Sequence, residues 1–286
     1  MLAIAFWNVH KNQGASPHIE DLIRNLSTGT ALPGHQGDVL CCLGEPTNVN
    51  AAQIVANLNG ANLGPWWHHT SVDGRFVLLT NLNQGSVQIG AQVAGCQPVT
   101  VTRVVGANPL AYQIWFVHLT APVGTAQQVI LMQSVAAELT RAMQQQELAA
   151  ANTRTLAIGD FNMPPYGPAM TAPQGLNAVA CKKIAARGSR TVLGTVYEYF
   201  YNPMWGLLGN QTADNQPGSY YLQDKADSTR WQLLDQVIVR PTLMERFIND
   251  SPRVLTGTGN NNLLRASGRI NENISDHLPV VVSLDV

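Results

Sequence analysis

The stretch LAIGDFNMPP, residues 156–165, joins a short apolar segment to a glycine, an acid, an aromatic residue and an amide, and it ends on two prolines. An apolar run of this length bounded by Gly and Pro is typical of a buried strand. We expect Gly159 to let the backbone leave the strand at this point. Asp160 and Asn162 would then project into a pocket, while Phe161 between them packs against apolar residues.

Similar apolar runs recur along the chain and are separated by loops rich in Gly, Asn and Pro. Apolar residues between Ile19 and Leu26 have the spacing of an amphipathic helix that begins near Ser16 and ends before Gly29. A second helical pattern covers roughly residues 124–151. Strands outnumber helices and alternate with them, which is typical of a mixed α/β fold with layered sheets. The expected strands are residues 2–8, 38–45, 75–81, 98–105, 112–118, 155–160, 233–239 and 278–284.

Polar side chains stand at the ends of five of these elements. A single Asn or Asp at a strand end usually forms a turn, and a single His usually has a structural role. Five such ends together favour a shared pocket, because layered α/β proteins assemble their sites where strands end. The residues are Asn8, Glu45, His118, Asp160 with Asn162, and Asp276 with His277.

The chain has 286 residues, of which 45% are hydrophobic and 12% are charged, and its formal net charge is −1. A chain of this size can bury a large core, and a single domain over residues 1–286 is the simplest organisation. Proteins that bind nucleic acid irrespective of sequence usually have a basic face. The near-neutral charge therefore neither supports nor excludes a phosphate-rich partner.

The cysteines and the N-terminal residues indicate the cellular compartment of the protein. Cys41, Cys42, Cys96 and Cys181 form no CxxC pair, which favours reduced structural thiols over a disulfide framework or a zinc site. The N-terminal run MLAIAFW lacks a basic region and a cleavage site, and no stretch approaches about 18 uninterrupted apolar residues. We therefore expect a cytoplasmic protein without a membrane segment. The low charge content permits a protein partner but does not indicate one.

Six motifs, in order, resemble those of the endonuclease/exonuclease/phosphatase superfamily, whose fold is deoxyribonuclease I-like. They are FWN, LGE, VHL, GDFN, LDQVIV and SDHLPVVV, and they cover nearly the whole chain. The pair GDFN and SDH is specific, whereas LGE and VHL alone would be weak signals. The resemblance implies an α/β (α+β) fold, a four-layered sandwich of two mixed sheets packed face to face with helices outside. It also implies metal-dependent cleavage of phosphate esters.

The residue types fit this chemistry. Carboxylate and amide oxygens suit Mg²⁺ or Mn²⁺, which share their coordination shell with water and substrate phosphate. Glu45 is the first expected metal ligand, and Asn8 and Asp276 would complete or orient that shell. Asp160 and Asn162 would position or deprotonate an attacking water.

Two histidines would complete the mechanism. His118 and His277 could donate to the non-bridging phosphate oxygens or transfer a proton. The resemblance implies that Asp235, in the motif LLDQVIV, holds His277 in the required tautomer. An acid within an apolar strand needs a partner, which also favours this pairing.

The chain departs from the superfamily pattern at several positions. Many members have an Arg before the Pro that opens the mid-chain strand, where this chain has Gln97. A phosphate-binding Arg is therefore either missing or replaced by Arg103.

Asp73 is a candidate partner for His118, as in some nucleases of the superfamily, and the alternative is a plain Asp-Gly turn.

The interval between Asp160 and Asp235 is longer than a minimal member needs, and we expect an insertion at about residues 166–231. An aromatic block at residues 196–223 either stacks on bases, covers the cleft or belongs to the core.

A basic run is either a solvated helix face or a phosphate-binding patch beside the site. The basic residues are Lys182, Lys183, Arg187 and Arg190.

The favoured function is a divalent-metal-dependent phosphodiesterase, an endonuclease or exonuclease that hydrolyses DNA or RNA with Mg²⁺ or Mn²⁺. The alternative is a phosphatase or phospholipase-type hydrolase of a small phosphoester or lipid headgroup, which the near-neutral charge and the missing Arg favour. A second alternative is a binding protein that keeps the fold without turnover. It predicts at least one lost catalytic position, whereas every position named for metal binding or catalysis is present.

Overall fold

The structure is a computed structural model that describes residues 1–10, 15–32, 37–105, 108–121, 126–208, 217–223, 228–248, 252–259 and 261–286. The chain divides into two compact units, each assembled from separate segments. Unit 1 comprises Met1–Ser86, Asn210–Gln232 and Phe247–Val286. Unit 2 comprises Val87–Gly209 and Leu233–Arg246. The single domain and its insertion at residues 166–231 stay predictions.

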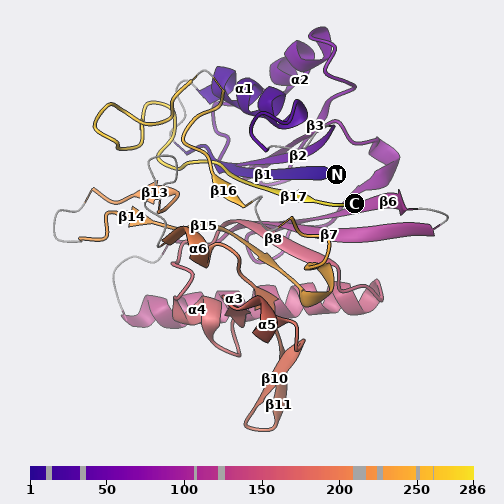
Figure 1. Ribbon diagram of the computed structural model, residues 1–286, viewed down its shortest axis with the longest axis vertical. Helices are drawn as coiled ribbons and strands as arrows, with labels where there is room; N and C mark the ends of the chain where they lie inside the picture. The colour runs from indigo at the N-terminus through magenta and orange to yellow at the C-terminus, as the bar shows by residue number, and fades with distance from the viewer. Residues whose placement is uncertain are drawn as a thin grey trace. The chain divides into compact units, whose positions relative to one another are not determined.

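Unit 1 is built on a mixed sheet. Among its described residues this sheet has six strands, in the order β16-β17-β1-β2-β4-β3. Strand β1 runs parallel to β2 and antiparallel to β17. Helices α1 and α2 cover one face of this sheet (Figure 1). The elements are β1 (Leu2–Asn8), α1 (Ala15–Ser27), β2 (Asp38–Gly44), α2 (Ala51–Gly60), β3 (Trp67–Thr70), β4 (Phe76–Thr80), the 3-10 helix η1 (Gln84–Ser86), β13 (Tyr220–Tyr221), β14 (Trp231–Gln232), β16 (Arg253–Val254) and β17 (Val280–Leu284).

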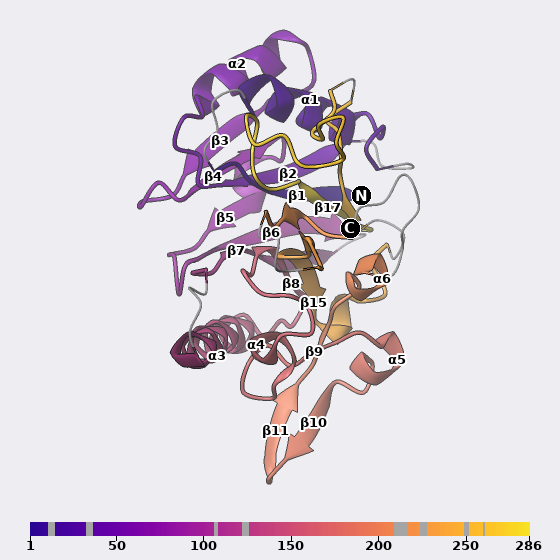
Figure 2. The same cartoon turned by 90° about the vertical axis from the view of Figure 1, so that its left-hand side faces the viewer.

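Unit 2 is built on a second mixed sheet. Its described residues form seven strands, in the order β5-β6-β7-β8-β15-β12-β9. The hairpin of β10 and β11 extends away from this sheet (Figure 2). The elements are β5 (Val87–Ile89), β6 (Cys96–Val105), β7 (Asn108–His118), α3 (Ala126–Ala149), β8 (Thr155–Asp160), α4 (Pro168–Thr171), β9 (Ala178–Val179), α5 (Lys182–Ala185), β10 (Ser189–Val192), β11 (Thr195–Glu198), β12 (Phe200–Tyr201), α6 (Trp205–Leu208), β15 (Asp235–Val239) and the 3-10 helix η2 (Pro241–Leu243).

Helix α3 packs on the sheet of unit 2 through a stripe of apolar residues. Met132, Ala136, Leu139 and Met143 are spaced by four, three and four residues, and all are buried. They share one core with residues of β7 and β8, including Trp115. Burial of this stripe stabilises the helix, since each fully buried large apolar side chain contributes about 1.5–3 kcal/mol.

The mixed α/β fold and the eight expected strands are confirmed, with shifts of a few residues at their ends. The expected helix near Ser16 is α1, and its apolar positions are buried. The expected helix at residues 124–151 is α3, although residues 124 and 125 lie outside the described part of the chain. Helix α2 was not predicted, because its interior contains polar residues and only three of its side chains are buried.

None of the four cysteines, all of which are among the described residues, is in a disulfide. Cys41 and Cys42 lie in β2 and are fully buried, whereas Cys181 is exposed. Burial raises the pKa of Cys41 to about 12. Burial, followed by the neighbouring Cys41, raises the pKa of Cys42 well above its usual value. Across the described ranges, no helix is long and apolar enough to cross a bilayer.

We expect one thiol per chain to react rapidly with a thiol reagent in the native protein at neutral pH. The thiolate is the reactive form. The buried thiols are inaccessible, and those of Cys41 and Cys42 are also hard to ionise. Absorbance titration with a chromogenic disulfide measures this, and a denaturant should expose all four thiols. Cys181→Ser should remove the rapid reaction, and rapid reaction of several thiols in the native state would contradict the buried placement.

Candidate functional site

Several of the expected site residues lie where strands β1 and β2 of unit 1 end, and we call this the edge of unit 1. Strands β1 and β2 are parallel, and Asn8 is opposite Gly44, the last residue of β2. The amide of Val9 donates to the carbonyl of Gly44 at 2.9 Å, which keeps the two strand ends together. Asn8 and Glu45 therefore leave the sheet side by side at the carboxyl ends of neighbouring strands. Both were predicted as metal ligands.

Glu45 has an unusual backbone conformation. Its φ is 50°, in the left-handed region that non-glycine residues seldom adopt. The amide of Glu45 donates to the carbonyl of Arg75 at 3.0 Å, so the turn before β4 holds this conformation. Such strain costs on the order of 1–3 kcal/mol and is concentrated at functional positions.

Asp73 lies in the same turn. Its carboxylate accepts from the Ser71 hydroxyl at 2.8 Å and from the Arg75 amide at 3.0 Å. These bonds and the left-handed Gly74 that follows are those of an Asp-Gly turn. The turn alternative is thus realised, and the pairing of Asp73 with His118, a residue of unit 2, stays a prediction.

The segment SDH is attached to the end of β1. The Ser275 hydroxyl donates to the Asn8 carbonyl at 2.7 Å and accepts from the His277 amide at 3.1 Å. The indole of Trp7 donates to the His277 carbonyl at 2.9 Å. Asp276 and His277 therefore belong to the same edge as Asn8.

A residue of the aromatic block supports His277. The Tyr220 and His277 rings lie 4.9 Å apart between centroids, and the two residues also form a β-bridge. Tyr199 and Phe200, earlier in the block, are buried. The block therefore contributes to packing and to the surroundings of His277, and its part at residues 209–216 lies outside the described chain.

His10 is a member of this edge that the sequence analysis missed. Its Nδ1 contacts the carboxylate of Glu45, and its amide donates to the Asn8 side-chain oxygen at 3.1 Å. The sequence signal for His10 was the order Asn-Val-His where β1 ends, since residues two apart in an extended chain lie on the same face.

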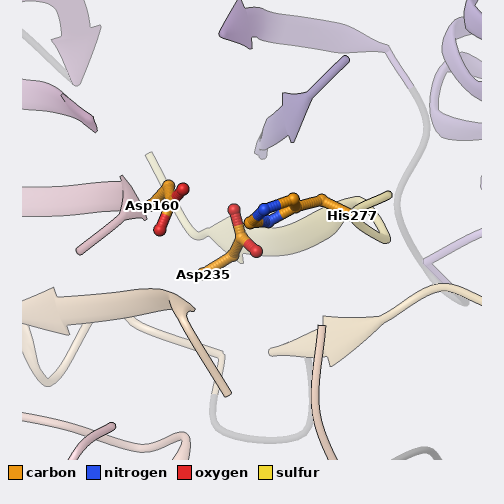
Figure 3. Close-up of side chains that lie close together, drawn as sticks. All are labelled: Asp160, Asp235 and His277. Atoms are coloured by element: carbon orange, nitrogen blue, oxygen red, sulfur yellow. The ribbon is translucent and has the colours of Figure 1, made fainter. Parts of the chain in front are cut away.

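The remaining residues lie where β7 and β8 end and β15 begins, and we call this the edge of unit 2. His118 is opposite Asp160 in the parallel pair of β7 and β8, and Asp235 is opposite Asp160 in the antiparallel pair of β8 and β15. Figure 3 shows Asp160 and Asp235, and it also labels His277 of unit 1. The His118 Nε2 lies 3.8 Å from the Asp160 Oδ2. All three side chains of this edge are buried.

Gly159 has a different role from the one expected. The strand does not end there, because β8 continues to Asp160 and Gly159 is paired on both sides. Its φ is 150°, and a Cβ atom would lie 2.0 Å from the carbonyl oxygen of Val117. Glycine is therefore required for the close approach of β7 and β8, which brings His118 next to Asp160.

Asn162 is fixed against Asp160 after the strand ends. The Asn162 amide donates to the Asp160 Oδ1 at 2.8 Å, and its side-chain nitrogen donates to the Leu119 carbonyl at 2.6 Å and to the Asp160 Oδ2 at 3.2 Å. Phe161 is fully buried in the core, as predicted. These bonds orient the Asp160 carboxylate.

The two acids of this edge create a concentrated negative charge. Their ligand oxygens lie within 4.8 Å of each other, and Asp160 and Asp235 are 1% and 0% exposed. Two buried carboxylates at this distance repel each other, and a cation or a shared proton between or near them relieves the repulsion. The two carboxylates supply hard oxygen atoms, the donor type that divalent ions such as Mg²⁺ or Mn²⁺ take.

Arg103 is far from this edge. It pairs with Leu110 in the ladder of β6 and β7, whereas His118 ends β7. Eight residues of strand separate Leu110 from His118, a distance of roughly 25 Å. Arg103 therefore does not join His118 and Asp160, which argues against the prediction that it replaces the missing phosphate-binding Arg.

The basic run lies beyond the β9 edge of the sheet. Lys182, Lys183 and Arg187 are exposed on and after α5. Arg190 instead donates to the Thr171 carbonyl at 2.9 Å and lies over the Tyr199 ring, 5.9 Å from its centroid. Arg190 thus has a structural role, and phosphate binding by the other three stays a prediction.

Comparisons with known proteins give matches at the level of structure. No family model matches the sequence, and no curated protein matches it. A 3′ phosphatase from Neisseria bound to a product DNA hairpin is similar at 13% identity with a TM-score of 0.54, and 100% of each chain is covered. An AP endonuclease from Archaeoglobus fulgidus is similar at 16% identity with a TM-score of 0.52, also over 100% of each chain. The human Nocturnin catalytic domain is similar at 14% identity with a TM-score of 0.51, over 98% of this chain and 93% of that one.

These likenesses establish the class of the fold. The chain has a deoxyribonuclease I-like fold. The resemblance carried by GDFN and SDHLPVVV is thereby confirmed at the level of fold.

Proposed function

We propose that this protein is a divalent-metal-dependent phosphodiesterase that hydrolyses nucleic acid. The observation that carries the proposal is the pair Asp160 and Asp235, two buried carboxylates on adjacent strands with His118 beside them. Buried like charges are costly unless the site uses them, and such groups cluster where catalysis occurs. The fold agrees, since the similar structures include a phosphatase bound to product DNA and an AP endonuclease.

The edge of unit 1 would hold the metal ion. Glu45 is the proposed ligand, with Asn8 and Asp276 completing or orienting the shell, and their oxygen atoms fit Mg²⁺ or Mn²⁺. When bound, the ion would supply positive charge to the phosphate and to the leaving oxygen.

The residues of unit 2 would activate the water. Asp160 accepts a proton from a water molecule that Asn162 helps to position, and the water oxygen attacks phosphorus. One new phosphorus–oxygen bond forms while the ester bond on the opposite side breaks, and the leaving oxygen takes up a proton. The products are an alcohol and a phosphate monoester.

The histidines would stabilise the negative charge that develops on the phosphoryl oxygen atoms. His118 and His277 donate to the non-bridging oxygens, where donors act most strongly in the transition state. Asp235 would hold His277 in the required tautomer.

A phosphatase is the second candidate function. The specific support is the similar 3′ phosphatase, together with the position of Arg103 away from the proposed site. A phosphatase needs no extended phosphate-binding surface, which also fits the near-neutral charge of the chain.

A substrate panel tests the proposal. Purified protein is incubated with duplex DNA, single-stranded DNA, RNA and a small phosphomonoester, each with Mg²⁺, with Mn²⁺ or with EDTA. We expect metal-dependent cleavage of at least one nucleic acid, absent with EDTA and lost in His277→Ala. Phosphate release from the monoester alone would favour the phosphatase, and equal cleavage with EDTA would contradict the metal dependence.

A further inference from the structure

We infer that His10 is a ligand of the divalent ion at Glu45 and that its imidazole nitrogen makes the site prefer Mn²⁺ to Mg²⁺. The inference rests on the proposed function in one respect, namely that a divalent ion binds at Glu45. It goes further by adding a nitrogen ligand to a site otherwise made of oxygen atoms.

The contact between His10 and Glu45 is the first observation. The Nδ1 of the imidazole faces the Oε2 of the carboxylate, and the two side chains are 42% and 33% exposed. A contact of this kind between partly exposed side chains contributes only about 1 kcal/mol to stability. Stability alone therefore gives little reason for these two side chains to converge.

The backbone around His10 is the second observation. The His10 amide donates to the Asn8 side-chain oxygen at 3.1 Å, and the Val9 amide donates to the Gly44 carbonyl at 2.9 Å. These two bonds fix the turn after β1 and direct His10 over the end of β2. Asn8, His10 and Glu45 thus present an amide, an imidazole and a carboxylate at one place.

The conformation of Glu45 is the third observation. Its left-handed backbone, with φ at 50°, costs on the order of 1–3 kcal/mol. The bond from the Glu45 amide to the Arg75 carbonyl, at 3.0 Å, holds this conformation and directs the carboxylate toward His10. A bound ion would stabilise the arrangement further, because metal coordination is much stronger than a contact between two side chains.

The donor types set the metal preference. Mg²⁺ binds almost entirely through oxygen and keeps several waters. Mn²⁺ takes oxygen donors as Mg²⁺ does, but as a first-row transition ion it accepts imidazole nitrogen more readily, so His10 as a ligand favours Mn²⁺ over Mg²⁺.

Pulsed electron paramagnetic resonance of Mn²⁺ bound to the full chain tests the inference directly. We expect a hyperfine coupling to a directly bound nitrogen in the wild-type protein. His10→Gln should remove this coupling, and His68→Gln should retain it, because His68 is an exposed histidine of the same unit, on β3. Bound Mn²⁺ without a nitrogen coupling that depends on His10 would overturn the inference.

Calorimetric titration with Mn²⁺ alone and with Mg²⁺ alone separates a ligand from a positioning residue. We expect His10→Gln to weaken Mn²⁺ binding by about 10–100-fold and Mg²⁺ binding much less. Equal weakening of both ions would mean that His10 only positions Glu45, and it would overturn the inference while leaving the proposed metal site intact. If the wild-type protein bound neither ion, or if Glu45→Gln bound both normally, the proposed metal site would fail as well.

Discussion

Asp160→Asn is expected to retain the fold and to lose about 10²–10⁴-fold of the turnover number. The variant keeps the shape of the side chain and an oxygen that can accept from the Asn162 amide, at 2.8 Å in the native protein. It loses the negative charge and the basicity needed to take a proton from water. Steady-state kinetics on the best substrate of the panel, with the melting temperature measured in parallel, checks both parts of the prediction.

The control for this variant is Glu138→Gln. Glu138 is an exposed acid on α3 in the same unit, so its substitution removes one negative charge without touching the site. The control should have wild-type kinetics. Turnover in Asp160→Asn within a few-fold of the wild type, with the protein folded, would rule out Asp160 as the base.

Arg240→Met is expected to lower the free energy of unfolding by about 3–5 kcal/mol. The guanidinium of Arg240 donates to both carboxylate oxygens of Glu147, at 2.9 and 3.0 Å, and lies over the Phe200 ring, 4.0 Å from its centroid. Arg240 and Glu147 are 2% and 3% exposed. Removal of the arginine leaves Glu147 buried without this partner, and denaturant titration measures the loss.

The matched control for Arg240→Met is the double variant Arg240→Met/Glu147→Leu. It removes both charges, and a buried ion pair replaced by apolar residues is often close to neutral in stability. We expect the double variant to recover most of the loss. If Arg240→Met alone costs less than about 1 kcal/mol, the pair is solvated and the buried geometry is wrong.

The sequence predicted the strands of both sheets well, because each is a short apolar run that ends at polar or turn-forming residues. It did not predict the division into two units, since each unit combines segments that are far apart in the sequence. The role of Gly159 was also misread. A glycine before a polar residue resembles a turn, whereas only the spacing to Val117 on the neighbouring strand shows that a side chain would not fit.

The site residues were predictable where a motif contained them. Asn8 and Asp160 end their strands, Glu45 follows β2 directly, and His277 lies shortly before β17. The metal-binding and catalytic roles of these residues stay predictions. His10 was missed because a histidine in a loop has many structural uses. Its contact with Glu45 depends on the parallel pairing of β1 and β2, which local sequence does not encode.

Arg240 was missed for a related reason. It follows a buried strand directly, where a charged residue usually marks the return to solvent. Its partner Glu147 lies near the end of α3, 93 residues earlier in the chain. The pair is therefore visible only once α3 is packed on the sheet.

A double-mutant cycle of Asp160→Asn and His277→Ala on nucleic-acid cleavage tests the central claim most directly. The claim is that Asp160 and His277 act in one hydrolytic reaction. Residues that act as a unit have strongly non-additive effects, so each single variant should lose most of the turnover and the double variant should be little worse than either. Losses that multiply, or a His277→Ala variant with wild-type turnover, would show that Asp160 and His277 do not act in one reaction.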